Sequence, residues 1–153
     1  MTKLLRTFLM GDSYDELDAA DFDALDVVPS SAPPSLVFGS VDEFVREKLI
    51  QQYRRVVGPP GRAHRRWAAE WWRYPEAVSR LEALWRSWEH LRLDGATGSS
   101  IWWRDHLDPH MAVLMDVDGP FAEAKDQNDP GEPLPYAHPP TGMFPDVRTA
   151  DVV

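Results

Sequence analysis

One stretch of the sequence, residues 100–121 (SIWWRDHLDPHMAVLMDVDGPF), gathers side chains that could do chemistry. It holds two histidines four residues apart, His106 and His110, with the carboxylates of Asp105 and Asp108 beside them. Imidazole and carboxylate groups are common ligands of zinc, iron and manganese. A metal-dependent hydrolase or nuclease built on these four residues is therefore one hypothesis for the function.

Two features of the same stretch argue against a metal centre. Pro109 stands between the two histidines, and a proline disfavours the continuous helix that their spacing requires. No glutamate stands beside His106 to act as the general base of a zinc hydrolase. We therefore expect a structural corner, in which Asp108 caps a helix that begins with Pro109. We assign no catalytic residue, no metal site and no cofactor, and the metal-dependent enzyme is the alternative.

Other catalytic patterns are missing from the sequence. The chain contains no cysteine, which excludes disulfides, thiolate nucleophiles and cysteine-ligated metal sites. It contains no glycine-rich phosphate loop and no nucleophile elbow. No stretch approaches the ~20 apolar residues of a membrane span, and the first residues do not form a signal peptide. We expect a cytoplasmic protein with no membrane partner, and nothing in these patterns requires an enzyme, although none of them excludes one.

A basic segment is the stronger candidate for a binding site. Between Phe44 and Arg73 the chain carries eight lysine or arginine residues against two glutamates, with His64 among them. Clustered arginines can neutralise the phosphates of a nucleic acid or bind an acidic protein surface. The alternative is an ordinary solvated face, with arginine stems lying over indole rings. The predicted partner-binding residues are Arg54, Arg55, Arg62, Arg65, Arg66 and Arg73.

The net charge of −9 belongs mainly to the two ends of the chain. Residues 1–35 hold seven acidic and two basic side chains, which predicts a disordered acidic leader and linker. This leader could itself bind the basic face. Residues 36–124 are almost neutral and form the predicted domain. Residues 125–153 contain six prolines, and we expect an extended, mobile tail.

The predicted domain is a small all-α bundle. Ser40 followed by Glu43 is a capping box, and apolar side chains at helical spacing predict a helix over residues 41–57. A short helix is expected over residues 62–72. Pro75 then suits the first position of a helix over residues 75–92. On the outer face of this last helix we expect two ion pairs at i,i+4 spacing, Glu76–Arg80 and Glu82–Arg86.

The rest of the domain is predicted as two further short helices. Ser99 or Ser100 can cap a helix that contains Ile101 to Arg104. A second helix is expected over residues 110–116, although a strand over 111–115 fits the same short apolar run. A bundle of short helices connected by loops follows from this pattern.

Tryptophan should dominate the core. All seven tryptophans lie between Trp67 and Trp103, so large aromatic side chains carry much of the burial in one region. Phe121 should fold back onto this core. The tryptophans predicted to be largely buried are Trp67, Trp71, Trp85, Trp88 and Trp102.

Three stretches connect the chain to a known family. They are WAAEWWRYPEAVSRLEALWRSWEHLR from Trp67, WWRDHLDPHMAVLMD from Trp102 and DGPF from Asp118. In these stretches residues 36–124 resemble an actinobacterial family of functionally uncharacterised proteins, catalogued as a domain of unknown function. Such proteins are common on plasmids, integrative conjugative elements and phages. The resemblance implies an accessory protein of a mobile element and brings no catalytic residue or ligand.

The chain departs from that family at three positions. Many members have cysteine, histidine and cysteine where this chain has Ala68, Tyr74 and Ala124. If those residues bind a structural metal ion in relatives, this chain has replaced all three ligands, and packing takes their place. The leading hypothesis is therefore a non-enzymatic interaction module of a plasmid or phage. Its arginine face would bind an acidic protein or a nucleic acid.

Overall fold

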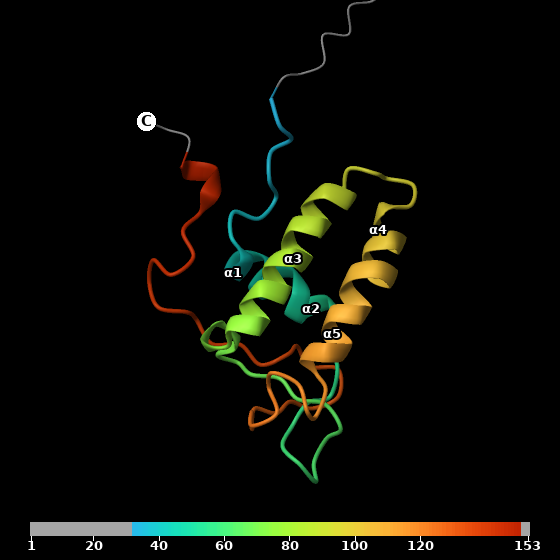
Figure 1. The fold of residues 1–153 in the computed structure, drawn as a ribbon, viewed down its shortest axis with the longest axis vertical. Helices are drawn as coiled ribbons and strands as arrows, with labels where there is room; N and C mark the ends of the chain where they lie inside the picture. Colours follow the sequence, from blue (N-terminus) through green and yellow to red (C-terminus); the bar gives the residue numbers. More distant parts are fainter. Residues whose placement is uncertain (1–31, 151–153) are drawn as a thin grey trace, which may run out of the picture. The chain divides into compact units, whose positions relative to one another are not determined.

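Residues 32–150 are described by the structure, which is a computed structural model. Most of the predicted acidic leader, residues 1–31, lies outside the described residues. From Ser35 onward the described chain belongs to one compact unit, which is helical and contains no strand among residues 32–150. The predicted all-α fold is confirmed for this part of the chain (Figure 1).

The first helix begins where the sequence predicts it. It consists of α1 (Val41–Phe44), η1 (Val45–Leu49), which has π geometry, and α2 (Ile50–Gln52). The hydroxyl of Ser40 accepts a hydrogen bond from the backbone N–H of Glu43 at 3.1 Å. The carboxylate of Glu43 reaches one residue further back than a standard capping box and accepts from Gly39 N–H at 2.8 Å. Both polar residues of the predicted cap are used.

This helix ends five residues before the predicted end at residue 57. Tyr53 leaves the helical region with φ −94° and ψ 70°. The reason is a competing long-range interaction, because Asn128 accepts a hydrogen bond from Val57 N–H at 2.9 Å and donates to Arg55 C=O at 3.0 Å. The backbone that would have extended the helix is bound to the C-terminal part of the chain.

The helix predicted over residues 62–72 is wrong. Only a 3₁₀ turn, η2 (Trp71–Arg73), forms at its end. Backbone groups of this segment bond to distant partners instead: Arg66 N–H donates to Met115 C=O, and Ala69 C=O accepts from Ala137 N–H, each at 3.0 Å. A run that is helical by composition is therefore an extended connection that packs against other segments.

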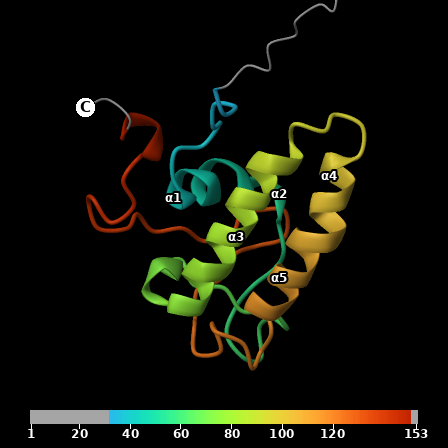
Figure 2. The same ribbon diagram turned by 45° about the horizontal axis from the view of Figure 1, so that its top comes forward.

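The third predicted helix is confirmed as α3 (Pro75–Leu91), with proline at its start. α4 (Gly98–Ile101), η3 (Trp102–Leu107) and α5 (Asp108–Leu114) follow it and form one continuous helix. This helix lies alongside α3 in both views, and α1 also contacts α3 (Figures 1 and 2). Gly98 allows the tight turn between them, because a Cβ there would collide with the carbonyl oxygen of Leu91.

The continuous helix overturns the predicted corner. Asp108 is helical, with φ −59° and ψ −46°, so it is not an N-cap, and no strand forms over residues 111–115. Pro109 is tolerated because η3 has π geometry, in which Asp108 N–H donates to Trp103 C=O five residues back. The wider turn relieves the clash that a proline ring makes with the carbonyl of an α-helix.

The core is rich in tryptophan, as predicted. Trp67, Trp71, Trp85 and Trp102 are buried, whereas Trp88 is only partly buried, so the prediction holds for four of the five. Phe121 is buried and meets the ring of Trp67 edge-on, with ring centroids 5.2 Å apart. Of the positions that depart from the family pattern, Ala68 and Ala124 are also buried.

Lys48 joins two sides of this core. From η1 its ammonium nitrogen lies 4.6 Å from the ring centroid of Trp88 and 5.7 Å from that of Trp102. Partial burial lowers the pKa of Lys48, while the two indole faces attract the charged form. The π segment of the first helix is thereby attached to α3 and to the π segment of the last helix.

The predicted proline-rich tail packs on the domain. Residues 125–150, the C-terminal segment, belong to the same compact unit, so the expected boundary at residue 124 separates no structural units. Leu134 is 2% exposed, and its backbone N–H donates to Ile50 C=O at 3.3 Å. The segment also accepts hydrogen bonds from two indoles: the buried Trp67 donates to Pro135 C=O at 2.9 Å, and the partly buried Trp72 donates to Ala137 C=O at 3.2 Å.

Glu89 holds the chain that enters the first helix. Its buried carboxylate accepts hydrogen bonds from Val37 N–H at 3.0 Å and from Phe38 N–H at 2.8 Å. Arg92 pairs with the same carboxylate at 2.7 Å and donates to Ser35 C=O. The buried carboxylate of Glu89 thus accepts the backbone N–H groups of a segment that has no regular secondary structure of its own.

We predict that Leu134→Ala destabilises the protein. Removing this buried side chain should lower the free energy of unfolding by about 2–5 kcal/mol, because it leaves a cavity beneath the C-terminal segment. Urea unfolding measures the change. Met143→Ala, at an exposed position of the same segment, is the control and should stay within about 0.5 kcal/mol of the parent protein. Equal stability of both variants would contradict the packed C-terminal segment.

We also predict that Glu89→Gln destabilises the protein by about 1.5–3 kcal/mol, since it replaces charge-assisted hydrogen bonds. The amide group of glutamine offers one acceptor to Val37 and Phe38 and removes the charge that pairs with Arg92. Chemical denaturation of the variant gives the value. Glu123→Gln, at an exposed position, controls for loss of a carboxylate and should leave the unfolding midpoint unchanged.

Candidate interaction surfaces

The four residues of the metal hypothesis share one helix without converging on a common point. Among residues 32–150 no group of three or more histidine, aspartate or glutamate side chains is placed to hold a metal ion. Asp105 is bound by its neighbour Arg104 at 2.7 and 3.0 Å, and this hydrogen bond lowers the pKa of the Asp105 carboxyl. The carboxylate of Asp108 is exposed. This geometry gives the metal-dependent hydrolase or nuclease no support.

His110 is engaged by α3. Its Nδ1 lies 3.0 Å from a guanidinium nitrogen of Arg80, which also binds Glu76 at 3.1 Å. Because arginine can only donate, Nδ1 of His110 accepts, and the proton of the neutral ring is on Nε2. Burial lowers the pKa of His110, with further contributions from the charges of Arg80 and His106. The neutral imidazole is therefore part of the contact between α3 and α5.

The six predicted partner-binding arginines do not form one face. Arg66 is buried, and its guanidinium donates to the carbonyls of Gly58 and Ala63 at 2.9 Å each. Arg73 is exposed and pairs with Glu70 three residues earlier, at 2.8 Å. Sequence proximity placed Arg66 in a binding face, whereas the structure gives it a supporting role inside the chain.

Two further arginines of the set are held close to the surface. Arg54 donates to Gly131 C=O at 2.7 Å and so fastens the C-terminal segment. The guanidinium of Arg55 lies 4.0 Å from the ring centroid of Tyr53. This contact is the arginine-over-aromatic arrangement that the sequence left open as the alternative to a binding face.

Residues 58–66, the arginine loop, present the remaining cations. Gly58 N–H donates to Arg65 C=O at 3.1 Å and closes the loop, which the guanidinium of Arg66 fills from inside. Arg62, His64 and Arg65 are exposed on it. Arg62 binds the carboxylate of Asp129 at 3.0 Å. The loop is thus a fixed backbone that carries arginine side chains outward and already binds one carboxylate.

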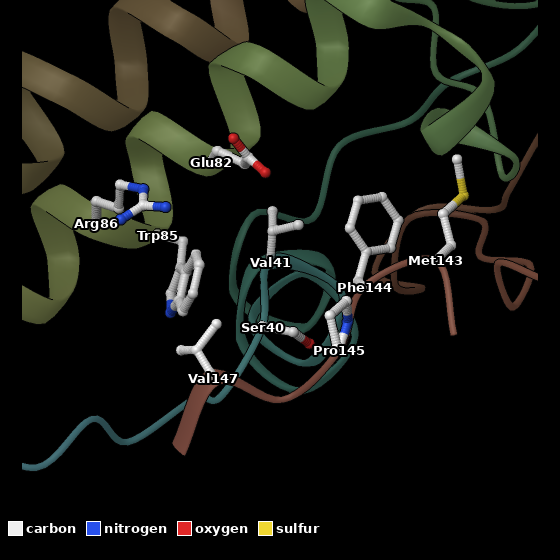
Figure 3. Close-up of a pocket in the computed structure, with 9 residues that line it drawn as sticks. All are labelled: Ser40, Val41, Glu82, Trp85, Arg86, Met143, Phe144, Pro145 and Val147. Atoms are coloured by element: carbon white, nitrogen blue, oxygen red, sulfur yellow. The ribbon is translucent and has the colours of Figure 1, made fainter. Parts of the chain in front are cut away.

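Sequence reasoning missed a second surface, a groove between α1, α3 and the C-terminal segment (Figure 3). The groove has a volume of about 230 Å³. Glu82, Trp85 and Arg86 of α3 line one wall, and Val41 and Phe144 face them from the two other segments. We call this the apolar groove. No single stretch of sequence signals it, because its walls come together only when the C-terminal segment packs.

Comparison with known proteins gives one match. Residues 38–142 match the model of a family described as a domain of unknown function (DUF4913). The match extends beyond residue 124 into the C-terminal segment, in agreement with the packing of that segment. No curated protein and no solved structure matches the chain. None of the helices within residues 32–150 has the length and hydropathy that a bilayer span requires.

We predict that His110 makes the stability pH-dependent. Its pKa is lowered in the folded protein, so the unfolded chain binds more protons as the pH falls. The stabilisation is present above the ordinary histidine pKa of ~6.5 and is lost as the pH falls through the lower pKa of the folded state. His110→Gln keeps an acceptor without titrating. The difference in unfolding free energy between the parent protein and this variant should therefore shrink from about pH 7.5 to about pH 5.

A constant difference for His110→Gln would show that protonation of His110 does not oppose folding.

Proposed function

The chain belongs to the DUF4913 family, and we propose that it is a non-enzymatic interaction module whose arginine loop binds an acidic segment of a partner protein. The loop is suited to this role by its rigidity. The Gly58–Arg65 hydrogen bond closes the loop, and the guanidinium of Arg66 binds its carbonyls from inside. The side chains of Arg62 and Arg65 therefore extend from a backbone that is held in place. A preorganised loop loses little conformational entropy when a partner binds.

The observation that carries the proposal is the ion pair between Arg62 and Asp129. The two side chains are 44% and 71% exposed, so a carboxylate from another molecule can reach the same guanidinium. Guanidinium groups bind carboxylates through a planar fork of donors, which makes arginine the preferred residue for such contacts. We propose that a carboxylate of the partner binds the guanidinium of Arg62 in the same way as Asp129 does within the chain.

An acidic protein segment fits this surface better than a nucleic acid. The chain from Met115 to Glu132 contacts the loop at two points, Arg66–Met115 and Arg62–Asp129. This stretch contains six acidic residues: Asp116, Asp118, Glu123, Asp126, Asp129 and Glu132. These carboxylates oppose any acidic partner, but a short acidic segment can contact Arg62 and Arg65 alone, whereas duplex DNA carries one negative charge per ~1.7 Å of its axis and would extend past the loop along the acidic stretch.

The cellular setting is a further part of the proposal. The resemblance described above supports an accessory protein of a plasmid or phage that acts in the cytoplasm. The acidic leader, which we predicted as a possible partner of the arginines, lies mostly outside the described residues, and its role stays a prediction. Its sequence nevertheless supplies a defined acidic probe for the loop, residues 12–26 (DSYDELDAADFDALD).

We predict that the full chain binds a fluorescent peptide of this sequence and that added salt weakens the binding. Arg62→Glu with Arg65→Glu should lower the affinity by about tenfold, since two exposed attractions become repulsions. Fluorescence anisotropy measures the affinity. The matched control is Arg104→Glu, which reverses a charge on the continuous helix and should leave the affinity unchanged.

Two outcomes would contradict the proposal. Unchanged affinity in the double variant would remove the arginine loop from the binding site. Tighter binding of a labelled DNA duplex than of the peptide, lost in the same double variant, would make a nucleic acid the partner instead.

A further inference from the structure

The apolar groove is shaped by three segments that are distant in sequence. Val41 comes from the first helix, Trp85 from α3 and Phe144 from the C-terminal segment (Figure 3). At its rim, Met143 and Val147 are 46% and 44% exposed, one at each end of the lining (Figure 3). The interior therefore has an aromatic and aliphatic lining that continues onto an exposed apolar rim.

The groove is held open by fixed contacts. Arg148 pairs with Asp146 at 2.7 Å and with Glu43 at 2.8 Å, and it donates to Val37 C=O at 2.7 Å. Val147 N–H donates to Gly39 C=O at 2.9 Å. The C-terminal segment is thereby attached to the residues at the start of the first helix. A partner meets a preformed surface and does not have to order it.

Two charged side chains on the α3 wall differ from what the sequence predicts. Glu76 and Arg80 form the expected i,i+4 ion pair at 3.1 Å. Glu82 and Arg86 have the same spacing, yet within residues 32–150 neither forms an ion pair or a hydrogen bond. The guanidinium of Arg86 lies 5.4 Å from the ring centroid of Trp85 instead. One negative and one positive group therefore flank the apolar lining, and both are available to a partner (Figure 3).

We propose that the apolar groove binds an extended segment of a partner protein that inserts one apolar side chain, with a basic residue near it that pairs with Glu82 and an acidic residue that pairs with Arg86. The apolar lining and the unpaired charges together specify this pattern. A peptide with a single apolar anchor and two opposite charges satisfies all three features.

The size of the groove favours one side chain over a small-molecule ligand. Sites for drug-sized molecules usually measure ~300–1,000 Å³, and this groove holds about 230 Å³. A cofactor or metabolite would be largely exposed in it. One leucine or methionine side chain, by contrast, can be covered by Trp85, Phe144 and the exposed rim. The groove shares no residue with the arginine loop, so this proposal does not depend on the proposed function.

The test uses the full chain and three defined peptides, each capped at both ends and nine residues long. The first carries leucine at its centre, with lysine two residues before and aspartate two residues after, in a background of serine and glycine. The second replaces leucine by serine, and the third replaces lysine by glutamate. Titrations are followed through the NMR signals of the Val41 and Val147 methyl groups, which lie in the groove.

We expect the leucine peptide to shift both methyl signals. Serine in place of leucine should weaken binding by about tenfold or more, because the burial of several methyl and methylene groups is lost. Glu82→Lys should weaken binding of the lysine peptide by about threefold and improve binding of the glutamate peptide by a similar factor. The control Glu123→Lys should leave all affinities unchanged.

The proposal fails if the leucine peptide shifts neither methyl signal at about 1 mM, or if the leucine and serine peptides bind equally. It also fails if Glu82→Lys does not exchange the preference between the lysine and glutamate peptides. Should Glu82→Lys not fold, Met143→Glu replaces it. That variant places a charge on the exposed rim and should weaken binding of the leucine peptide by about tenfold.

Discussion

Packed indole rings organise this fold, and three of them also bind distant segments by donating their N–H groups to backbone carbonyls. The buried indole nitrogens of Trp71 and Trp85 have no hydrogen-bond partner within residues 32–150, so these two rings contribute through packing alone. An indole supplies much apolar surface, but its nitrogen is costly to bury unless it donates a hydrogen bond. Trp102 donates to Leu84 C=O within the helical layer at 3.1 Å. Trp67 and Trp72 donate to carbonyls of the C-terminal segment. A proline-rich chain suits this purpose, because a backbone without regular secondary structure has carbonyl groups to offer.

Both interaction surfaces depend on that same segment. Asn128 is buried and forms hydrogen bonds with the backbone on both sides of Val56. These bonds hold in place the irregular connection that leads into the arginine loop. Asp129, the next residue, supplies the carboxylate that Arg62 binds. Further along, Phe144 stacks on the buried ring of Trp71, with centroids 5.4 Å apart, and forms part of the apolar groove. Packing of the C-terminal segment thus creates the geometry from which partner binding is proposed.

Sequence periodicity and capping residues correctly predicted those helices whose backbone makes no competing long-range hydrogen bonds. The periodicity of α3 and the cap at Ser40 were sufficient, because propensity, pattern and packing agree there. The helix predicted over residues 62–72 failed, since its backbone bonds to residues about 50 to 70 positions away. The corner at Pro109 failed for another reason: a π turn accommodates the proline, and no local pattern distinguishes that solution from a helix end.

Side-chain roles at the surfaces were less predictable than the helices, because neighbours in sequence have opposite environments. Arg65 is exposed and Arg66 is buried, although both belong to one basic cluster. Likewise the i,i+4 rule holds for Glu76–Arg80 and not for Glu82–Arg86. An exposed ion pair contributes only about 0–1 kcal/mol, so the face of a nearby indole competes with a carboxylate for the same guanidinium. Arg86 lies over Trp85, and Glu82 has no ion-pair partner within residues 32–150.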